Sequence, residues 1–191
     1  MRTTVFSTPV ITPILRVLAI AMLALTGWKA VDRQLGTRRF VLIGAPHTSN
    51  WDFPLMLAVV LRLRLKVYWM GKHTLFAFPF GSLMKWLGGI PIDRSRAHNV
   101  VQQTVAQYQQ HLDLIVLVPP EGTRSKVERW KTGFYHIACQ AKVPILMGYV
   151  DAGNKEAGLA DFFFPTGDLA ADMEEIRKFY ADKRGINPEN A

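Results

Sequence analysis

A histidine and an aspartate five residues apart, His47 and Asp52, form the pattern with the clearest chemical meaning in this sequence. They lie in the stretch PHTSNWD at 46–52, directly after an apolar run. On one continuous helix this separation turns the two side chains roughly 140° apart, so they would not meet. If His47 ends a loop and Asp52 lies in the first turn of a helix, the carboxylate can hold one ring nitrogen. The other nitrogen is then free to take a proton from a hydroxyl. The pair is our candidate catalytic dyad, and a capping histidine beside a helix-start aspartate is the alternative.

The dyad has no obvious nucleophile within the protein. No serine stands in a nucleophile-elbow pattern, and the single cysteine, Cys139, lies in an apolar stretch where we expect a packed thiol. A dyad without a nucleophile suits direct transfer, in which the acceptor hydroxyl itself attacks. The remaining histidines have no metal-ligand spacing, so we expect no metal; they are His73, His98, His111 and His136.

A second polar cluster, EGTRSK at 121–126, follows an apolar run that ends at Val118. Glycine permits close backbone approach, while hydroxyl and cationic side chains suit a phosphate. The candidate binding residues are Glu121, Gly122, Thr123, Arg124, Ser125 and Lys126. Glu121 would either fix the loop or bind a polyol hydroxyl. In a third segment, GGIPIDR at 88–94, Arg94 would reach a phosphate or pair with Asp93. An ordinary charged turn remains the alternative for 121–126, and the Asp93–Arg94 ion pair is the alternative for the third segment.

These motifs need a scaffold, and the apolar pattern predicts an α/β fold. We expect strands at 39–45, 66–70, 89–92, 114–118 and 144–150, with a further buried strand at the FFF of 162–164. Helices are expected at 51–63, 98–112, 133–141 and 168–183. Alternating strands and helices indicate a mostly parallel central sheet with helices on both faces. The candidate site residues then gather at the carboxyl ends of the strands.

Composition restricts the partners. A formal net charge of +8 beside a mean hydropathy of +0.09 suggests a packed core plus apolar surface, with basic residues attracting acidic partners. Nucleic acid is the least favoured partner, since the basic residues are dispersed and no common nucleic-acid motif is present. An anionic membrane and a phosphorylated substrate are both compatible with this charge.

The N-terminal segment is the candidate membrane contact. Within 9–28, Pro13 and Arg16 leave only 17–28 uncharged, which is shorter than the ~20 residues that span a bilayer. We expect an amphipathic helix lying on the membrane surface, with a core helix of the domain as the alternative. The predicted organisation is a membrane-associating helix at 1–30 and a catalytic domain at 31–191. The aromatic stretch 76–80 is assigned to core packing by default, with contact with the membrane as the alternative.

Together these segments resemble the glycerolipid acyltransferases typified by 1-acylglycerol-3-phosphate acyltransferase, also called lysophosphatidic acid acyltransferase. Four blocks of that family are matched in order over roughly 39–150: the H-x4-D block at 47–52, the second block at 89–94, the E-G-T-R-S block at 121–125 and the V-P-I block at 143–145.

The resemblance implies a fatty acyl transfer from acyl-CoA or acyl-carrier protein to a hydroxyl of a lysophospholipid. His47 would be the general base and Asp52 would orient it, while Arg94 and the 121–125 block would bind the acceptor. It implies a peripheral or monotopic membrane enzyme at the cytoplasmic face that needs no cofactor beyond its co-substrate and binds neither nucleic acid nor metal. The alternatives are another acceptor, such as glycerol 3-phosphate or an amino-acid-derived lipid, and a non-catalytic membrane-binding module.

Overall fold

The computed structural model describes residues 3–92 and 97–190, with the backbone alone for 97–99. Within those residues, seven strands form one sheet in the order β1-β7-β6-β2-β5-β3-β4. The strands are β1 (Lys29–Val31), β2 (Arg39–Ala45), β3 (Val67–Lys72), β4 (Gly89–Ile92), β5 (Leu114–Val118), β6 (Ile145–Asp151) and β7 (Glu156–Phe163). All neighbouring pairs are parallel except the antiparallel pair β6 and β7. The predicted mostly parallel sheet is confirmed.

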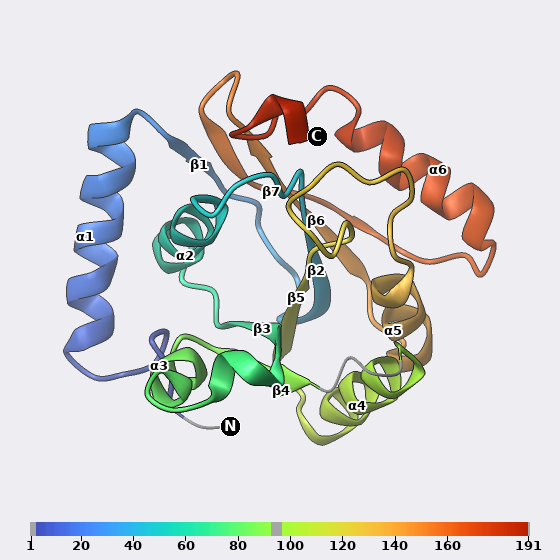
Figure 1. Cartoon of the computed structure of the whole chain (residues 1–191), viewed down its shortest axis with the longest axis horizontal. Helices are drawn as coiled ribbons and strands as arrows, with labels where there is room; N and C mark the ends of the chain where they lie inside the picture. Colours follow the sequence, from blue (N-terminus) through green and yellow to red (C-terminus); the bar gives the residue numbers. More distant parts are fainter. Residues whose placement is uncertain (1–2, 93–96, 191) are drawn as a thin grey trace.

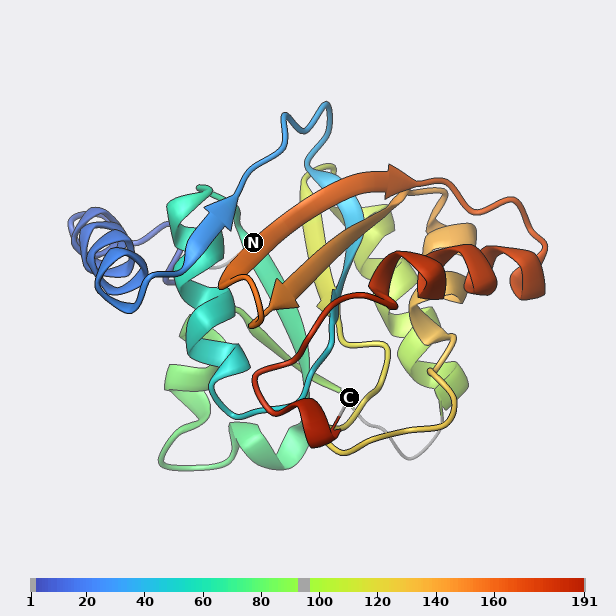
Figure 2. The same ribbon diagram turned by 90° about the horizontal axis from the view of Figure 1, so that it is seen from above.

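Helices cover both faces of this sheet (Figures 1 and 2). They are α1 (Ile11–Thr26), α2 (Asp52–Arg62), α3 (Gly81–Trp86), α4 (Ala97–Gln110), α5 (Gly133–Ala141) and α6 (Leu169–Tyr180), with short 3-10 helices η1 (His73–Phe76) and η2 (Pro188–Asn190). One apolar core joins α1, α2 and α3 to the sheet, and a second joins α4, α5 and α6 to its other face. Because both faces are covered, the central strands are apolar throughout rather than alternating.

Four elements have the boundaries that the sequence predicted. Strands β2, β4 and β5 and helix α5 begin and end at the predicted residues. The prediction for β7 was wrong in extent: it runs through Glu156–Phe163, while Phe164 lies beyond it and is exposed. The three-residue β1 was not predicted. It pairs in parallel with β7 and contains the predicted domain boundary between 30 and 31.

Helix α1 packs against α2 and leaves its other side open. Ala19 and Leu23 are buried, and Gly27, at φ 74°, ends the helix and turns the chain into β1. Arg16 carries the one charge within α1, and its Nε donates to the Leu61 carbonyl at the end of α2, 3.1 Å away. The outer side is apolar and exposed, with Leu25 88% accessible. Among the described residues, no helix has the length and apolar character that a membrane crossing requires.

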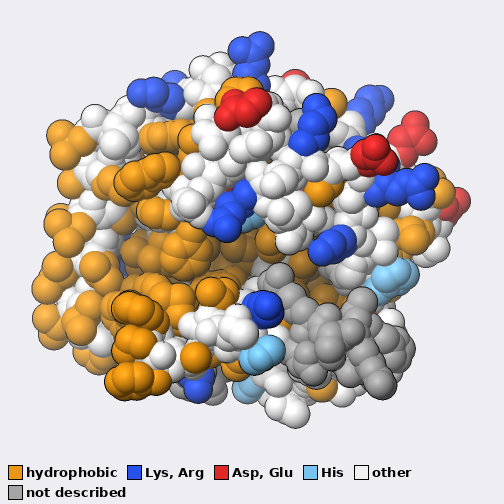
Figure 3. Space-filling model, in the orientation of Figure 1, with side chains coloured by type: hydrophobic (Ala, Val, Ile, Leu, Met, Phe, Trp, Pro, Cys, Tyr) orange, Lys and Arg blue, Asp and Glu red, His pale blue; other side chains and the backbone are white. Residues whose placement is uncertain are grey.

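The aromatic stretch between β3 and α3 is only partly core. Phe76 stacks on Trp69 with ring centroids 5.9 Å apart. Phe78, however, is 98% exposed and Phe80 is also exposed, so the default assignment of the stretch to core packing is wrong for these two residues. Figure 3 shows hydrophobic side chains gathered over α1 and α3 and around a hollow between them. The molecule thus has a continuous apolar face on the side of α1 and α3.

Candidate active site

His47 and Asp52 meet at the carboxyl end of β2. His47 Nδ1 lies 2.9 Å from Asp52 Oδ2, and the same oxygen accepts hydrogen bonds from the backbone amides of Thr48 and Ser49, each 2.8 Å away. Asp52 opens α2, so the loop 46–51 folds back over the first turn of the helix. The predicted contact between a loop histidine and a helix-start aspartate is present.

The aspartate is buried, whereas the imidazole is accessible. Asp52 is 6% exposed, and its Oδ1 is enclosed without a hydrogen-bond partner among the described residues. The side chain of His47 keeps 28% of its surface open. With Asp52 ionised, Nδ1 carries the hydrogen that bonds to Oδ2, which leaves Nε2 as a proton acceptor. The pair has the protonation geometry of a general base held by a carboxylate.

Glu121 supports the same histidine from the neighbouring strand end. β2 and β5 are paired up to Ile43 and Val118, so the residues that follow them lie side by side. Both carboxylate oxygens of Glu121 accept from the backbone amide of His47, at 3.1 and 3.0 Å. Of the two roles left open for Glu121, the structure has it fixing the loop.

Glu121 is held there at an electrostatic cost. Burial raises the pKa of its carboxyl above the ordinary value of 4.5, and the nearby Asp52 carboxylate raises it further. The hydrogen bond from His47 N opposes this rise. Two carboxylates therefore hold His47: Asp52 contacts the ring, and Glu121 accepts from the backbone amide.

A cavity of about 710 Å³ opens beside the dyad, and we call it the dyad cavity. This volume lies within the roughly 300–1,000 Å³ that is usual for small-molecule sites. Phe53, Met56 and Val60 line it from α2, and Trp69 lines it from β3. The lining is mostly apolar, as a fatty acyl chain would require. The sequence did not single out these side chains as site residues, although the spacing of three to four residues among Phe53, Met56 and Val60 is typical of one face of a helix.

The 121–126 loop contributes three of its candidate residues to the dyad cavity. Gly122, Thr123 and Arg124 line it together with His47 and Asp52. Ser125 and Lys126 are exposed and line neither this cavity nor the second one described below. The predicted convergence of imidazole, carboxylate and guanidinium at one cavity is present. Arg94 lies outside the described residues.

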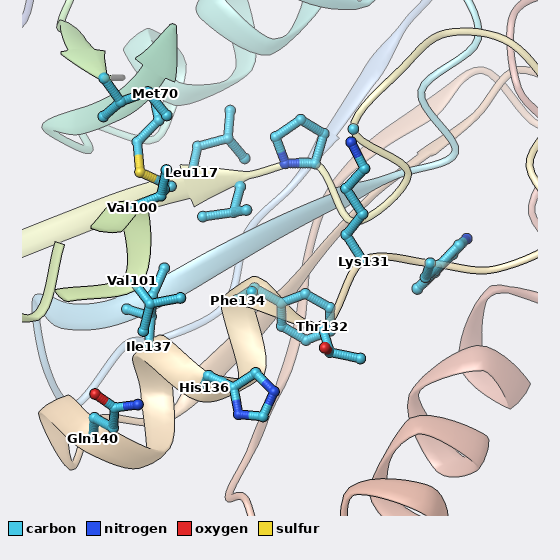
Figure 4. Close-up of a pocket in the computed structure, with 16 residues that line it drawn as sticks. Met70, Val100, Val101, Leu117, Lys131, Thr132, Phe134, His136, Ile137 and Gln140 are labelled. Atoms are coloured by element: carbon cyan, nitrogen blue, oxygen red, sulfur yellow. The ribbon is translucent and has the colours of Figure 1, made fainter. Parts of the chain in front are cut away.

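A second cavity of about 700 Å³ lies on the other face of the sheet, between α4 and α5 (Figure 4). Val101 lines it from α4 and Ile137 from α5, while Lys131 extends toward the end of β5. Leu117 and Gly122 line both cavities. Gly122 has φ 68°, a left-handed conformation that favours glycine, and a Cβ there would lie 2.8 Å from Lys131 Nζ. Lys131 therefore packs along the loop that separates the two cavities.

The described residues contain no group of three histidine, cysteine, aspartate or glutamate side chains that could hold a metal ion. Cys139 is exposed on α5, contrary to the packed thiol expected from its apolar surroundings. It lines neither cavity.

A family model described as Acyltransferase matches residues 29–147, well over half of the chain. The chain belongs to the Acyltransferase family. The predicted enzyme class is confirmed with it, and the His47–Asp52 dyad and the 121–126 loop lie within the matched region.

The fold of this acyltransferase is also found among solved structures. The crystal structure of PlsC, the 1-acyl-sn-glycerophosphate (LPA) acyltransferase from Thermotoga maritima, aligns with a TM-score of 0.60 and 16% sequence identity. The alignment covers 88% of this chain and 76% of PlsC. At this identity the likeness establishes a shared fold. A comparison with curated protein sequences gave no match.

Proposed function

We propose that this acyltransferase moves a fatty acyl group from acyl-CoA or acyl-carrier protein to a hydroxyl of a lysophospholipid such as 1-acylglycerol 3-phosphate. The observation that carries the proposal is the 2.9 Å contact between His47 Nδ1 and Asp52 Oδ2 at a cavity that Arg124 also lines. The fold shared with PlsC, an LPA acyltransferase, supports the choice of acceptor class.

In the proposed mechanism the acceptor hydroxyl attacks the thioester carbonyl directly. His47 Nε2 takes the hydroxyl proton as the new C–O bond forms, and the imidazolium is stabilised by Asp52 on Nδ1. The tetrahedral intermediate then expels the thiolate, which takes the proton back from His47. Because no enzyme nucleophile is used, no acyl-enzyme forms. Asp52 does not take the proton; it holds the ring orientation and tautomer.

The two ends of the dyad cavity suit the two substrates. Its apolar wall, formed by Phe53, Met56 and Trp69, suits a fatty acyl chain. At the rim, the planar guanidinium of Arg124 suits the acceptor's phosphate, to which it can donate two parallel hydrogen bonds. Lys126 would add longer-range attraction for an anionic acceptor or donor, as would the net charge of +8.

We further propose that the apolar face formed by α1 and the segment 75–83 rests on a lipid bilayer. Since Arg16 is turned inward to Leu61, the outer side of α1 carries no charge that would resist insertion. The exposed Phe78 and Phe80 extend this face, and the neighbouring Leu75 and Met84 line the dyad cavity. A lysolipid would then enter the site from the membrane surface, on the cytoplasmic side where the thioester donors are found.

Acyl transfer from a labelled thioester to a panel of acceptors tests the proposed reaction. We expect product with lysophosphatidic acid, and a loss of about 10³-fold or more in His47→Ala. His111→Ala, outside both cavities, should retain the wild-type rate. Preference for glycerol 3-phosphate or an amino-acid-derived lipid would reassign the acceptor. Equal rates in wild type and His47→Ala would instead favour the non-catalytic membrane module.

Sedimentation with anionic liposomes tests the membrane face. Val17→Asp and Leu18→Asp together introduce charge on the exposed side of α1 and should release the protein from the vesicles. Leu112→Asp is the matched control, because Leu112 is equally apolar and exposed but precedes β5 at the opposite end of the strand from the dyad. Equal binding of all variants would contradict the proposed face.

A further inference from the structure

The C-terminal segment 184–190 returns to the site after α6 and lies against the loop that carries His47 (Figure 2). The Ala152 amide donates to the Arg184 carbonyl at 2.7 Å, which ties the start of the segment to the turn between β6 and β7. Ile186 then packs against the core on the α2 face. The segment is therefore anchored in the fold before it reaches the loop.

Thr48 is the point of contact between this segment and the loop. Thr48 Oγ1 accepts from the backbone amide of Asn187 at 3.1 Å, and the Thr48 carbonyl accepts from Asn187 Nδ2 at 3.3 Å. Asn190 Nδ2 donates to the same carbonyl, also at 3.3 Å. A Cβ at Gly185 would lie 2.5 Å from Thr48 Oγ1, so the approach is too close for any other residue. Thr48 is 2% exposed, enclosed by these contacts.

The same threonine helps to set the dyad. Its backbone amide donates to Asp52 Oδ2, the oxygen that also contacts His47 Nδ1. Thr48 is thus held by Asp52 on its amide side and by Asn187 on its carbonyl and hydroxyl side. A shift of Thr48 would move the backbone amide that donates to Asp52, and it would also move the adjacent imidazole of His47. Displacements of about 1 Å in a reacting group are enough to slow catalysis substantially.

We propose that Asn187 is a positioning residue for the dyad, acting through Thr48. The proposal rests on the proposed function, since it requires His47 and Asp52 to perform the chemistry. Asn187 lines neither cavity, so its action is on the geometry of the loop and not on substrate. A segment 139 residues away in sequence thereby completes the H-x4-D loop.

Asn187→Ala provides the kinetic test. We expect kcat to fall by about tenfold, with KM for donor and acceptor within about twofold of wild type, because the loop is loosened while the cavity is unchanged. Asn154→Ala is the matched control: Asn154 Nδ2 donates to Asp151 Oδ2 at 2.8 Å in the nearby β6–β7 turn and does not contact Thr48. A wild-type kcat in Asn187→Ala, or a matching fall in Asn154→Ala, overturns the proposal.

Substitutions at Thr48 test the route of action. Thr48→Val removes the hydroxyl acceptor at nearly constant shape and should lower kcat, whereas Thr48→Ser keeps the acceptor and should restore most of the rate. In the double variant Thr48→Val with Asn187→Ala, the two losses should be less than multiplicative, since the substitutions remove two hydrogen bonds of one Thr48–Asn187 junction: the amide of Asn187 to Thr48 Oγ1, and Asn187 Nδ2 to the Thr48 carbonyl. Fully multiplicative losses would show that Asn187 acts by another route and overturn the proposal.

Hydrogen exchange separates this proposal from the function on which it rests. Amides of 47–52 should exchange faster in Asn187→Ala than in wild type or Asn154→Ala, whatever the activity. Faster exchange with an unchanged kcat, in a protein that His47→Ala inactivates, refutes the positioning role. If His47→Ala remains fully active, the dyad mechanism itself has failed and the positioning proposal falls with it, while the exchange data still report the contact.

Discussion

The two cavities are similar in size and apolar character, about 710 and 700 Å³, and they share Leu117 and Gly122 in their walls. They differ in the groups that converge on them. In the dyad cavity the buried carboxylate of Asp52 contacts the accessible imidazole of His47. The carboxylate of Glu121 accepts from the backbone amide of the same histidine. The second cavity also has an imidazole, from His136, but none of the described residues that line it carries a carboxylate. Volume and apolarity therefore do not identify the site; the pairing of titratable groups does.

The difference follows from the sheet. The dyad cavity lies where β2 and β5 end side by side, so residues distant in sequence meet there. The second cavity is formed largely between two helices that present side chains of one apolar core. This comparison predicts which substitutions affect catalysis and which affect packing alone.

Asp52→Asn should have the largest effect of the substitutions that probe this comparison. Without the negative charge the imidazolium is not stabilised, so we expect kcat to fall by about 10²–10⁴-fold with little change in donor KM. His136→Ala, which removes the imidazole of the second cavity, should stay within about twofold of wild type. A loss of the same size in both variants would remove the distinction between the cavities.

Arg124→Ala should weaken binding of the acceptor more than it slows the chemical step. Loss of a charge-assisted contact to phosphate predicts a rise in acceptor KM of about tenfold, which diminishes as salt is added. Lys126, on the same loop but outside both cavities, is the control, and Lys126→Ala should change KM by no more than about twofold. Steady-state kinetics over a range of ionic strength would measure both. Equal effects would mean that general charge and not position binds the acceptor.

Met56→Trp should shift the preferred acyl donor toward shorter chains by several-fold, because it fills part of the dyad cavity. Val101→Trp fills the second cavity and should lower thermal stability without altering chain preference. Competition between thioesters of different chain length measures the first effect, and calorimetry measures the second. A shift in chain preference from Val101→Trp alone would assign the acyl chain to the second cavity.

Glu121→Gln should have the smallest effect, a pH-dependent change in stability. Burial raises the pKa of Glu121 above 4.5, so the folded protein binds this proton more tightly than the unfolded chain does. Its contribution to stability is present below pH 4.5 and is lost as the pH rises through the elevated pKa. The melting temperature of wild type relative to Glu121→Gln should therefore fall by a few degrees between acidic and neutral pH. Glu174→Gln, exposed on α6, should show no such trend; a pH-independent difference in Glu121→Gln would contradict the assignment.

The sequence alone predicted the elements whose signals are local. The strands β2 and β5 are continuous apolar runs, and the H-x4-D spacing indicated that His47 and Asp52 meet only across a loop and a helix start. β1 could not be predicted, because three residues give no period and the strand exists only through its pairing with β7. Likewise, the exposure of Phe78 depends on how η1 and α3 pack, so composition pointed wrongly to the core.

What the sequence determined was the chemistry available: an imidazole, a carboxylate and a guanidinium after apolar strands, in the order of a known family. What only the tertiary structure decided was how those groups are held. Glu121 on the amide of His47 and Asn187 on Thr48 are contacts between segments 74 and 139 residues apart. Such contacts leave no local periodicity or spacing, because they arise from strand order in the sheet and from the return of the chain after α6.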